Sequence, residues 1–290
     1  MKAVGSRKAT LIKSTPIALG DVLPSGNLAV RQGLCTLVQP CLRRPQHARC
    51  FRFFDTTLLL VTSGQLTIDT DEASMSLSDS LSLIVMAQNS SGDIKKTPGG
   101  EDHTFRSVFL AFAPEVILEF HRLHQNETLT SSAATFGRQI SFDSDLEDVL
   151  SYCLRGMQSA KVSDREQKHR LIGLLLALSD RGCYFPHPSI KSIGDRLRKI
   201  LADAPAYPWT AAKASRELAM SEATLRRKLT IEKLRFETLL LDIRMHYAMT
   251  LLQTTPWSVS QIAEACGYRA NSRFSSRFRE RFGCSPSHVR

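Results

Sequence analysis

Two groups of basic and small polar side chains near the end of the chain have the chemistry to bind DNA. An arginine can hydrogen-bond a guanine edge or a phosphate, while serine, threonine and asparagine permit close approach to a base. The first group is Glu222, Ala223, Thr224, Arg226, Arg227 and Lys228. The second group is Asn271, Ser272, Arg273, Ser275, Ser276, Arg277 and Arg281. We expect Arg227, Arg273, Ser276 and Arg277 to lie nearest the bases, and Lys228 and Arg281 to contact phosphates.

The distribution of charge supports this expectation. The 290-residue chain carries a formal net charge of +10. The last hundred residues carry 18 Lys and Arg against 9 Asp and Glu, so almost all of the excess lies there. The first 190 residues are nearly neutral and the last hundred are basic, which indicates that only the C-terminal part binds a polyanion.

The elements that position the two groups form a weak internal repeat. Thr210 and Ser258 are good N-caps, and each opens a helix of about two turns. A turn follows, which at Gly267 has the residue best suited to a positive φ. Each second helix then has an apolar pair at i and i+4, Leu225 with Leu229 and Phe274 with Phe278. The pattern predicts two helix-turn-helix units, at about 210–229 and 258–281.

A single helix is predicted between the two units, over residues 236–252. Seventeen residues at about 1.5 Å each span roughly 25 Å. A rod of this length could hold two recognition helices roughly 34 Å apart, the separation of successive major-groove segments on one side of DNA. The recurrence of a basic face at matched spacing favours DNA contact over an ordinary solvated surface.

Residues from about Ile193 to Arg290 resemble the DNA-binding domain of the AraC/XylS family of bacterial transcription regulators. The motifs that carry the resemblance are Trp209-Thr210, Met220-Ser221-x-x-x-Leu225, Arg244-Met245, Val259-x-x-Ile262-Ala263-x-x-x-Gly267-Tyr268 and Phe274-x-x-x-Phe278-x-x-x-Phe282-Gly283-x-Ser285-Pro286. The resemblance implies a seven-helix domain with recognition helices at about Glu222–Leu229 and Asn271–Arg281. The turn at Leu218-Ala219-Met220-Ser221 is most like a branch that includes virulence and acid-resistance (stress) regulators. Lys233 departs from the family pattern, which usually has glycine there.

The front of the chain is β-like. Short apolar or alternating segments at 57–62, 65–69, 75–78, 81–86 and 105–112 predict strands of a small barrel or sandwich. Asn89–Asp102, rich in Ser, Gly and Lys, is predicted to be a long exposed loop. Helices are predicted at 115–124, 146–157 and 166–178, and the last is apolar enough for either a subunit interface or an internal core helix.

The predicted fold class is α+β: an N-terminal regulatory and dimerisation domain at 1–185, a linker at 186–192, and an all-α DNA-binding domain at 193–290. The N-terminal part is similar to the family's cupin-like β-barrel. That resemblance implies an activator that acts with RNA polymerase, responds to a small effector or a partner protein, and forms a homodimer.

Candidate effector-binding residues are Arg52, Lys95 and Lys96, although exposed solvated charges are the simpler interpretation. The histidines at 47, 103, 121 and 124 do not form the H-x-H pattern of a cupin metal site, so no metal or cofactor is predicted. Seven irregularly spaced cysteines, with no C-x-x-C pair, are typical of reduced thiols.

Two other classes of protein also contain DNA-binding domains of this size. An enzyme with a methyl-accepting cysteine, fused to the DNA-binding domain, would need a Cys₄ zinc cluster or a Pro-Cys-His-Cys centre, and the sequence has neither. It also has no Ser/His/Asp spacing, Walker loop or G-x-G-x-x-G motif. A shape-reading, nucleoid-type protein without effector control is the alternative that remains. With no 18-residue apolar run and no signal peptide, the expected location is the cytoplasm, on the nucleoid and without membrane contact.

Overall fold

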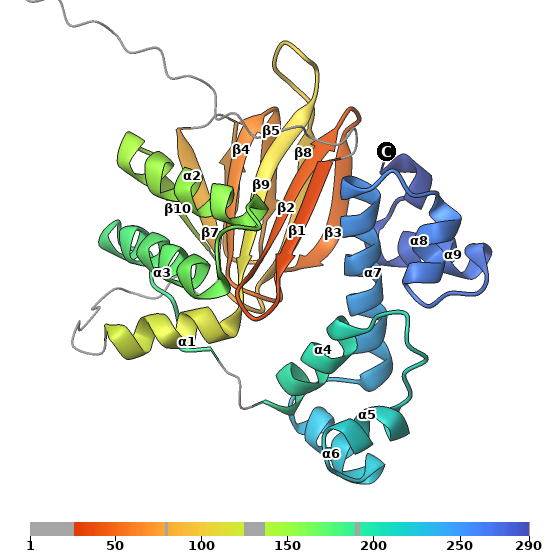
Figure 1. Ribbon diagram of the computed structural model, residues 1–290. Coiled ribbons are helices and arrows are strands. Elements are labelled where there is room, and N and C mark those ends of the chain that lie inside the picture. The colour runs from red at the N-terminus through yellow and green to blue at the C-terminus, as the bar shows by residue number, and fades with distance from the viewer. Residues whose placement is uncertain (1–25, 79–80, 125–136, 189–191, 290) are drawn as a thin grey trace, which may run out of the picture.

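A computed structural model describes residues 26–78, 81–124, 137–188 and 192–289. The described residues form an N-terminal part of two β-sheets with three helices, followed by a helical C-terminal part (Figure 1). The expected α+β organisation is therefore confirmed. Residues 189–191 of the predicted linker, and residues 1–25 of the predicted regulatory domain, lie outside the described residues.

The larger sheet has six antiparallel strands in the order β1-β2-β9-β4-β7-β10. Its strands are β1 (Gly26–Arg31), β2 (Cys35–Leu42), β4 (Thr57–Ser63), β7 (Ser82–Met86), β9 (Phe105–Phe112) and β10 (Gly137–Ser141). Five consecutive residues of β4, Thr57 to Val61, are buried, because this strand is covered on both faces. A continuous apolar run instead of a strict alternation is typical of such a strand.

The smaller sheet has four antiparallel strands in the order β3-β8-β5-β6. These strands are β3 (Gln46–Arg52), β5 (Gln65–Asp69), β6 (Ser74–Leu77) and β8 (Ser91–Thr97). Apolar side chains from the facing sides of the two sheets, including Leu59, Ile68 and Phe105, form one buried cluster.

The prediction of a long exposed loop at 89–102 was wrong. Seven of these residues form strand β8, which lies between β3 and β5. Ile94 and Lys96 alternate with Asp93 and Lys95, and the first pair is buried. The alternation was masked because two of the three inward positions are occupied by Gly92 and Lys96 instead of large apolar residues.

Three helices cover the other face of the large sheet (Figure 1). They are α1 (Pro114–Leu123), α2 (Ser144–Gln158) and α3 (Asp164–Asp180). In α3 the side chains of Leu171, Leu174, Leu175 and Leu178 are fully buried within the chain. Of the two interpretations of this helix, the structure favours an internal core helix.

The C-terminal part is built around one long helix, α7 (Phe236–Thr254) (Figure 1). The remaining helices are α4 (Ile193–Asp203), α5 (Ala211–Glu217), α6 (Glu222–Ile231), α8 (Val259–Ala265) and α9 (Asn271–Phe282), with a 3₁₀ turn at Pro286–His288. No helix within the described ranges has the length and apolar content to cross a membrane.

Candidate nucleic-acid interface

The first helix-turn-helix unit consists of α5 and α6. The Thr210 hydroxyl caps α5 by accepting a hydrogen bond from the Lys213 amide, and Ser221 caps α6 in the same way through Thr224. The turn between them passes through Ala219 at φ +55°. Leu225 and Leu229 are buried against the rest of the unit, so the opposite face of α6 is turned to solvent.

Polar side chains on α6 differ in how far they are already paired. Arg226 forms a salt bridge to Glu222, 2.8 Å from Nη2 to Oε1, and lies 3.7 Å from Glu237. The Thr224 hydroxyl lies 2.9 Å from that of Ser221. Arg227 and Lys228 are exposed, and neither has a hydrogen bond or ion pair with any described residue. These two side chains can therefore bind an anionic ligand without first breaking an ion pair.

The second unit consists of α8 and α9. Ser258 and Gln261 form a capping box at the start of α8, in which each side chain bonds the backbone amide of the other. Gly267 adopts φ +76° in the turn, as the sequence predicts. Three phenylalanines of α9, Phe274, Phe278 and Phe282, are buried in the core of this unit. They fix the helix with its polar face outward.

The outward face of α9 carries Asn271, Ser272, Arg273, Ser276 and Arg277, all exposed, while Ser275 is half-buried. Arg277 pairs with Glu280 at 2.8 Å, and the Ser276 hydroxyl donates to the same carboxylate at 3.2 Å. Arg277 lowers the pKa of Glu280 by this hydrogen bond. Arg273 has no hydrogen bond or ion pair with a described residue, so its position at the start of the helix leaves it open to a ligand.

Arg281 does not share this exposed face. Its Nε lies 2.6 Å from Oδ1 of Asp242 in α7, and its Nη1 donates to the carbonyl of Arg49 in β3 at 3.2 Å. Its side chain is only 15% exposed. A phosphate contact by Arg281 stays a prediction, and in this arrangement it would require the ion pair with Asp242 to break.

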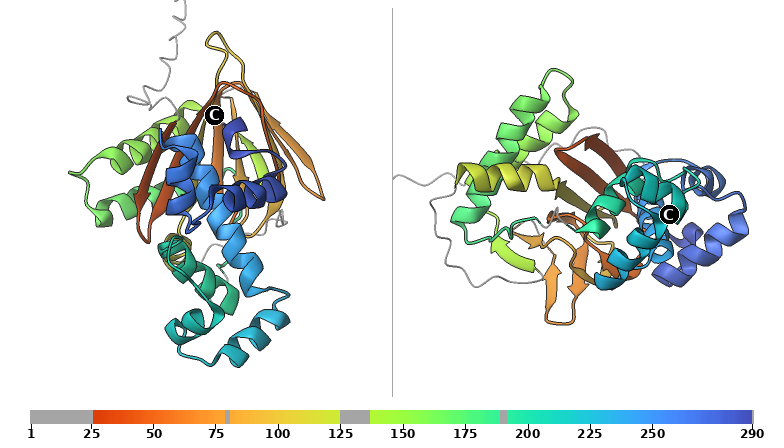
Figure 2. Two further views of the ribbon diagram at one scale, coloured as in Figure 1. Left: turned by 90° about the vertical axis from the view of Figure 1, so that its right-hand side faces the viewer. Right: turned by 90° about the horizontal axis from the view of Figure 1, so that it is seen from below.

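The long helix α7 holds the two units at its two ends (Figure 2). Phe236, Leu239 and Ile243, from its first half, pack in the core of the first unit. Met245, Ala248 and Leu252, from its second half, pack in the core of the second unit. Its 19 residues correspond to about 28 Å.

Strand β3 and the residues after it reach into the cores of both units. Ala48 is buried in the core of the second unit, where Phe51 also packs. Phe54 packs against the core of the first unit. Phe51, Phe54 and Phe282 surround the imidazole of His246 with ring centroids at 4.6, 5.0 and 5.5 Å. Burial, with the nearby Arg281 and Arg52, lowers the pKa of His246 to about 3.

A second part of this contact is polar and buried. Gln253 of α7 donates from Nε2 to Oε1 of Gln46 at 2.6 Å, and Lys96 donates to Oε1 of Gln253 at 3.3 Å. The ammonium of Lys96 also lies 4.8 Å from the ring centroid of Phe109. Burial lowers the pKa of Lys96 to about 7. The expectation of an exposed, solvated Lys96 was therefore wrong, since α7 covers the sheet at that point.

The three candidate effector residues lie on strands β3 and β8 but do not meet. In the pairing of the two strands, Arg52 lies opposite Ser91, and Lys95 lies opposite His47. Lys95 is exposed, on the face opposite to that of Lys96. Arg52 instead borders a hollow of about 300 Å³ between the two parts of the molecule, together with Phe54, Asn89, Arg198, Glu232 and Leu239.

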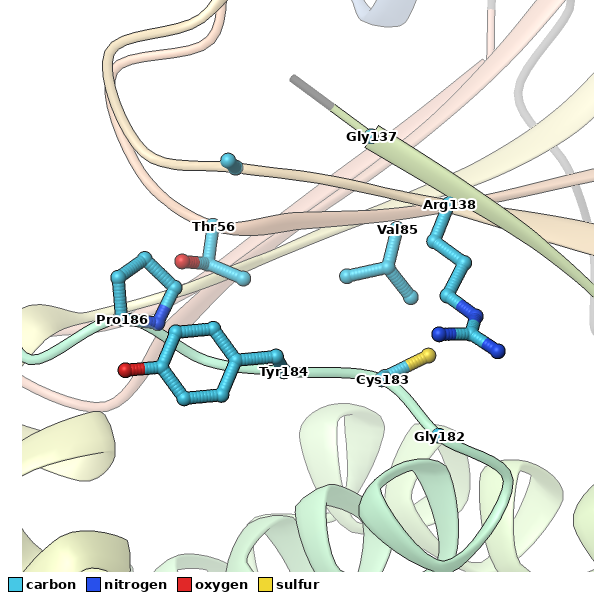
Figure 3. Close-up of a pocket in the computed structure, with 9 residues that line it drawn as sticks. Thr56, Val85, Gly137, Arg138, Gly182, Cys183, Tyr184 and Pro186 are labelled. Carbon is cyan, nitrogen blue, oxygen red and sulfur yellow. The ribbon is translucent and has the colours of Figure 1, made fainter. Parts of the chain in front are cut away.

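Another hollow lies within the N-terminal part, next to strand β10 (Figure 3). Arg138, Cys183 and Tyr184 are among the residues that line it. Its volume is only about 20 Å³, enough for a single water molecule. The hollow beside Arg52 is the larger of the two.

Sequence reasoning missed the residues that tie α4 to the N-terminal part. Arg198 donates to the Asn89 side chain at 2.5 Å and to the carbonyl of Phe54 at 3.3 Å, and it pairs with Asp195. Lys199 pairs with Glu115 of α1. Burial raises the pKa of Asp55, beside Arg198, to about 6. Apart from Asp195, the partners of Arg198 and Lys199 are 84 or more residues away along the chain, so no local pattern indicates them.

Comparison with known proteins gives one family model and several relatives. Residues 214–290 match a family described as "Helix-turn-helix domain". The chain is 39% identical over 100 residues to the HTH-type transcriptional regulator YdeO of Escherichia coli, covering 34% of this chain and 39% of YdeO. It is 34% identical over 121 residues to the virulence regulon transcriptional activator VirF of Shigella flexneri, covering 41% and 46%. The chain thus spans less than half the length of these two relatives.

Among solved structures, ToxT from Vibrio cholerae has the same overall fold. One ToxT structure matches with a TM-score of 0.61 at 17% identity, covering 88% of this chain and 97% of ToxT. A ToxT structure with a bound unsaturated fatty acid matches with a TM-score of 0.59 at 15% identity, covering 89% and 96%. The family model and the two relatives show that the C-terminal part carries a helix-turn-helix domain similar to those of AraC-family transcription regulators, and the ToxT matches show the fold alone.

Proposed function

We propose that the chain is a sequence-specific DNA-binding transcription regulator that contacts two adjacent major-groove segments. The observation that carries this proposal is the pair of helices α6 and α9, each buried on its apolar side and exposed on its basic side, at the two ends of α7. Arg227 and Lys228 on α6, and Arg273 on α9, have no competing partner among the described residues. Arginine and asparagine at the start of a recognition helix can bond base edges.

Selection from a pool of random DNA duplexes, at fixed salt, tests this function. A specific regulator should enrich a two-segment site and bind it about 10³-fold or more tightly than unrelated DNA. Equal affinity for all duplexes would instead favour the nucleoid-type alternative, in which the backbone and shape of DNA are the only features bound.

Activation is the second part of the proposal. VirF, one of the relatives, is named as a transcriptional activator. We infer that this chain also raises transcription, in contact with RNA polymerase, when bound beside a promoter. Transcription in vitro from a template that carries the selected site should increase when the protein is added. A decrease at saturating protein would identify a repressor.

Control by a small anionic effector completes the proposal. A ToxT structure contains an unsaturated fatty acid, and the hollow of about 300 Å³ beside Arg52 is comparable with small-molecule sites. The Arg52 guanidinium has no hydrogen bond with a described residue. Burial lowers the pKa of the neighbouring Arg198, and the like charge of Arg52 lowers it further, while Asp55 opposes the shift. A carboxylate would relieve this repulsion between like charges. We propose that Arg52 binds the effector carboxylate.

Sodium oleate is a suitable probe for this part. Its addition should raise the melting temperature and change DNA affinity in the wild type, and Arg52→Gln should abolish both effects. Lys95→Gln is the matched control, because Lys95 is an exposed cation of the neighbouring strand β8 and does not line the hollow. An unchanged oleate response in Arg52→Gln would rule out this site.

The same proposal assigns different functions to the two parts of the chain. Residues 1–185 would bind the effector and form a homodimer, and residues 193–290 would bind DNA. A fragment of residues 190–290 should bind the selected site, because both units and α7 lie within it. Sedimentation of the full chain and of the fragment should give a dimer and a monomer; a dimeric fragment would place the subunit contact in the C-terminal domain.

A further inference from the structure

Arg244 lies at the boundary between the two helix-turn-helix units. The last residue that α7 contributes to the core of the first unit is Ile243, and the first fully buried residue that it contributes to the core of the second unit is Met245. The two buried cores have no residue in common. The orientation of one unit relative to the other therefore depends on α7, on the N-terminal part that packs against both cores through Phe51 and Phe54, and on contacts that cross this boundary directly.

The Arg244 side chain bonds the first unit. Its Nε donates to the carbonyl of Pro205 at 3.0 Å, and its Nη2 donates to the carbonyl of Tyr207 at 2.9 Å. These carbonyls belong to the loop that joins α4 to α5, just before the N-cap Thr210. Bonds from a charged donor are stronger than those between neutral groups, so Arg244 fixes this loop to α7.

The same guanidinium also contacts the second unit. It lies over the ring of Tyr268, with 5.8 Å between Cζ and the ring centroid. The ring of Tyr268 in turn packs edge-on against Phe274 of α9, at 5.6 Å between centroids. A chain of contacts thus runs from the loop before α5, through Arg244, to the first buried residue of the second recognition helix.

Gly267 shows how closely the two units approach at this point. A Cβ atom on Gly267 would lie 2.7 Å from Nη2 of Arg244 and 2.9 Å from the carbonyl oxygen of Ala206. The turn of the second unit therefore meets the loop of the first unit directly, with the guanidinium between them. Position 267 therefore requires glycine for two reasons, its positive φ and the lack of room for a Cβ atom.

We propose that Arg244 is a positioning residue that fixes the orientation of the two helix-turn-helix units, so that α6 and α9 bind two DNA segments at a single spacing. The proposal rests on the DNA-binding function proposed above. A lysine cannot replace this arginine, because one compact ammonium group cannot donate two directed bonds and also stack its plane on a tyrosine ring. Without the guanidinium, each unit keeps its own core but loses the direct contact between the two units, so their relative orientation is less restricted.

The dependence of affinity on spacing tests this proposal. The probes are the duplex selected by the wild type, the same duplex with one to five base pairs inserted between its segments, and a duplex that keeps one segment. Five base pairs turn one segment by roughly half a turn of DNA. For the wild type we expect each insertion to reduce affinity, by about 10-fold or more at five base pairs, because simultaneous binding is lost.

Arg244→Ala should bind the uninterrupted site about 10-fold more weakly and should lose most of the dependence on spacing. Its affinity for the single-segment duplex should stay within about twofold of the wild type, because each recognition helix remains folded. Arg244→Lys should behave like Arg244→Ala. Arg235→Ala, which removes an exposed cation beside the start of α7, should lower affinity evenly and keep the dependence on spacing.

The outcomes distinguish this inference from the proposed function. If the wild type selects no site, the DNA-binding function itself fails. If it selects a site and Arg244→Ala keeps the full penalty for insertion, the function stands and the role of Arg244 is refuted. Should Arg244→Ala unfold, Arg244→Lys answers the same question, since it keeps the charge and most of the side-chain volume.

A measurement without DNA gives a second readout. Spin labels on non-canonical residues at Ile231 and Arg279, both exposed, report the distance between the two units. The distance distribution should be narrow in the wild type and broader in both Arg244 variants, with unchanged helical content. Equally narrow distributions in all three proteins would show that α7 and the N-terminal part set the orientation without Arg244, against the proposal.

Discussion

The two helix-turn-helix units differ in how they are packed and in how they meet the β domain, which is the N-terminal part formed by the two sheets and helices α1 to α3. The first unit has a core with small side chains, Ala211 and Ala214, beneath α6. It meets the β domain through the polar contacts of Arg198 and Lys199 and through the aromatic side chain of Phe54. The core of the second unit contains three phenylalanines from α9 and accepts Ala48 and Phe51 from strand β3.

This difference has a consequence for regulation. The exposed Lys199–Glu115 ion pair contributes little to stability, and the other polar contact of the first unit is a pair of hydrogen bonds from Arg198. Separating the second unit from the β domain would expose a larger apolar surface and also the polar groups of Gln46, Lys96 and Gln253. The first unit should therefore be the easier of the two to release. An effector in the hollow beside Arg52 would act at the first unit, because Glu232 and Leu234, which follow α6, line that hollow.

The largest effect should come from the core of the second unit. Phe278→Ala removes a fully buried ring, and we expect it to lower the free energy of unfolding by about 3–5 kcal/mol. Urea denaturation followed by far-UV circular dichroism measures this change. Arg279→Ala, the exposed neighbour, should change stability by less than about 0.5 kcal/mol. A loss of similar size for both variants would contradict the assigned core.

The contact between the second unit and the β domain should also depend on pH, through His246. Its folded-state pKa, about 3, lies below the ordinary value of 6.5, so the unfolded chain binds a proton that the folded chain does not accept. The contribution of neutral His246 to the free energy of unfolding is therefore fully present above pH 6.5, and it is lost as the pH falls toward 3. Between pH 6.5 and 4 the loss should reach roughly 3 kcal/mol.

The comparison with His246→Gln isolates this effect from other titrating groups. Asp55, with its pKa raised to about 6, acts in the opposite direction, since it stabilises the fold less as the pH rises through 6. The groups that face His246 are Phe51, Phe54 and Arg52 from the β domain, and Phe282 and Arg281 from α9. Melting curves of wild type and variant that fall in parallel from pH 7 to 4 would exclude His246 as the cause.

The sequence predicts the helices of the two units well, but it does not predict their contacts with distant parts of the chain. N-caps, turns and apolar pairs lie within a few residues of one another, so both units, their recognition helices and α7 were predicted within a few residues. Contacts between distant segments were not. The inward position of Arg281 depends on Asp242, 39 residues away, and on the carbonyl of Arg49, 232 residues away. Strands β1, β2 and β3 were also missed, because prolines interrupt the apolar runs of that region.

The two recognition helices should differ in what their cations contribute. Arg277→Ala on α9 should relax base preference at one position of the site, by about 1–3 kcal/mol. Lys228→Ala on α6 should lower affinity evenly for all sequences and reduce the salt dependence by about one phosphate contact. Repeated selection with each variant, and titration at several salt concentrations, measures both quantities. Identical base preferences in the two variants would refute this division of roles.

The smallest effect should be a gain of stability in the first unit. Lys233 follows α6 with φ +56°, a left-handed conformation that is unfavourable for a residue with a side chain. Lys233→Gly should raise the free energy of unfolding by about 1 kcal/mol, because the relief of strain outweighs the greater freedom of glycine in the unfolded chain. Lys233→Ala removes the same charge and keeps the unfavourable φ, so it should give no gain. A gain in the alanine variant equal to that of the glycine variant would show that the charge of Lys233, and not its backbone, weakens this unit.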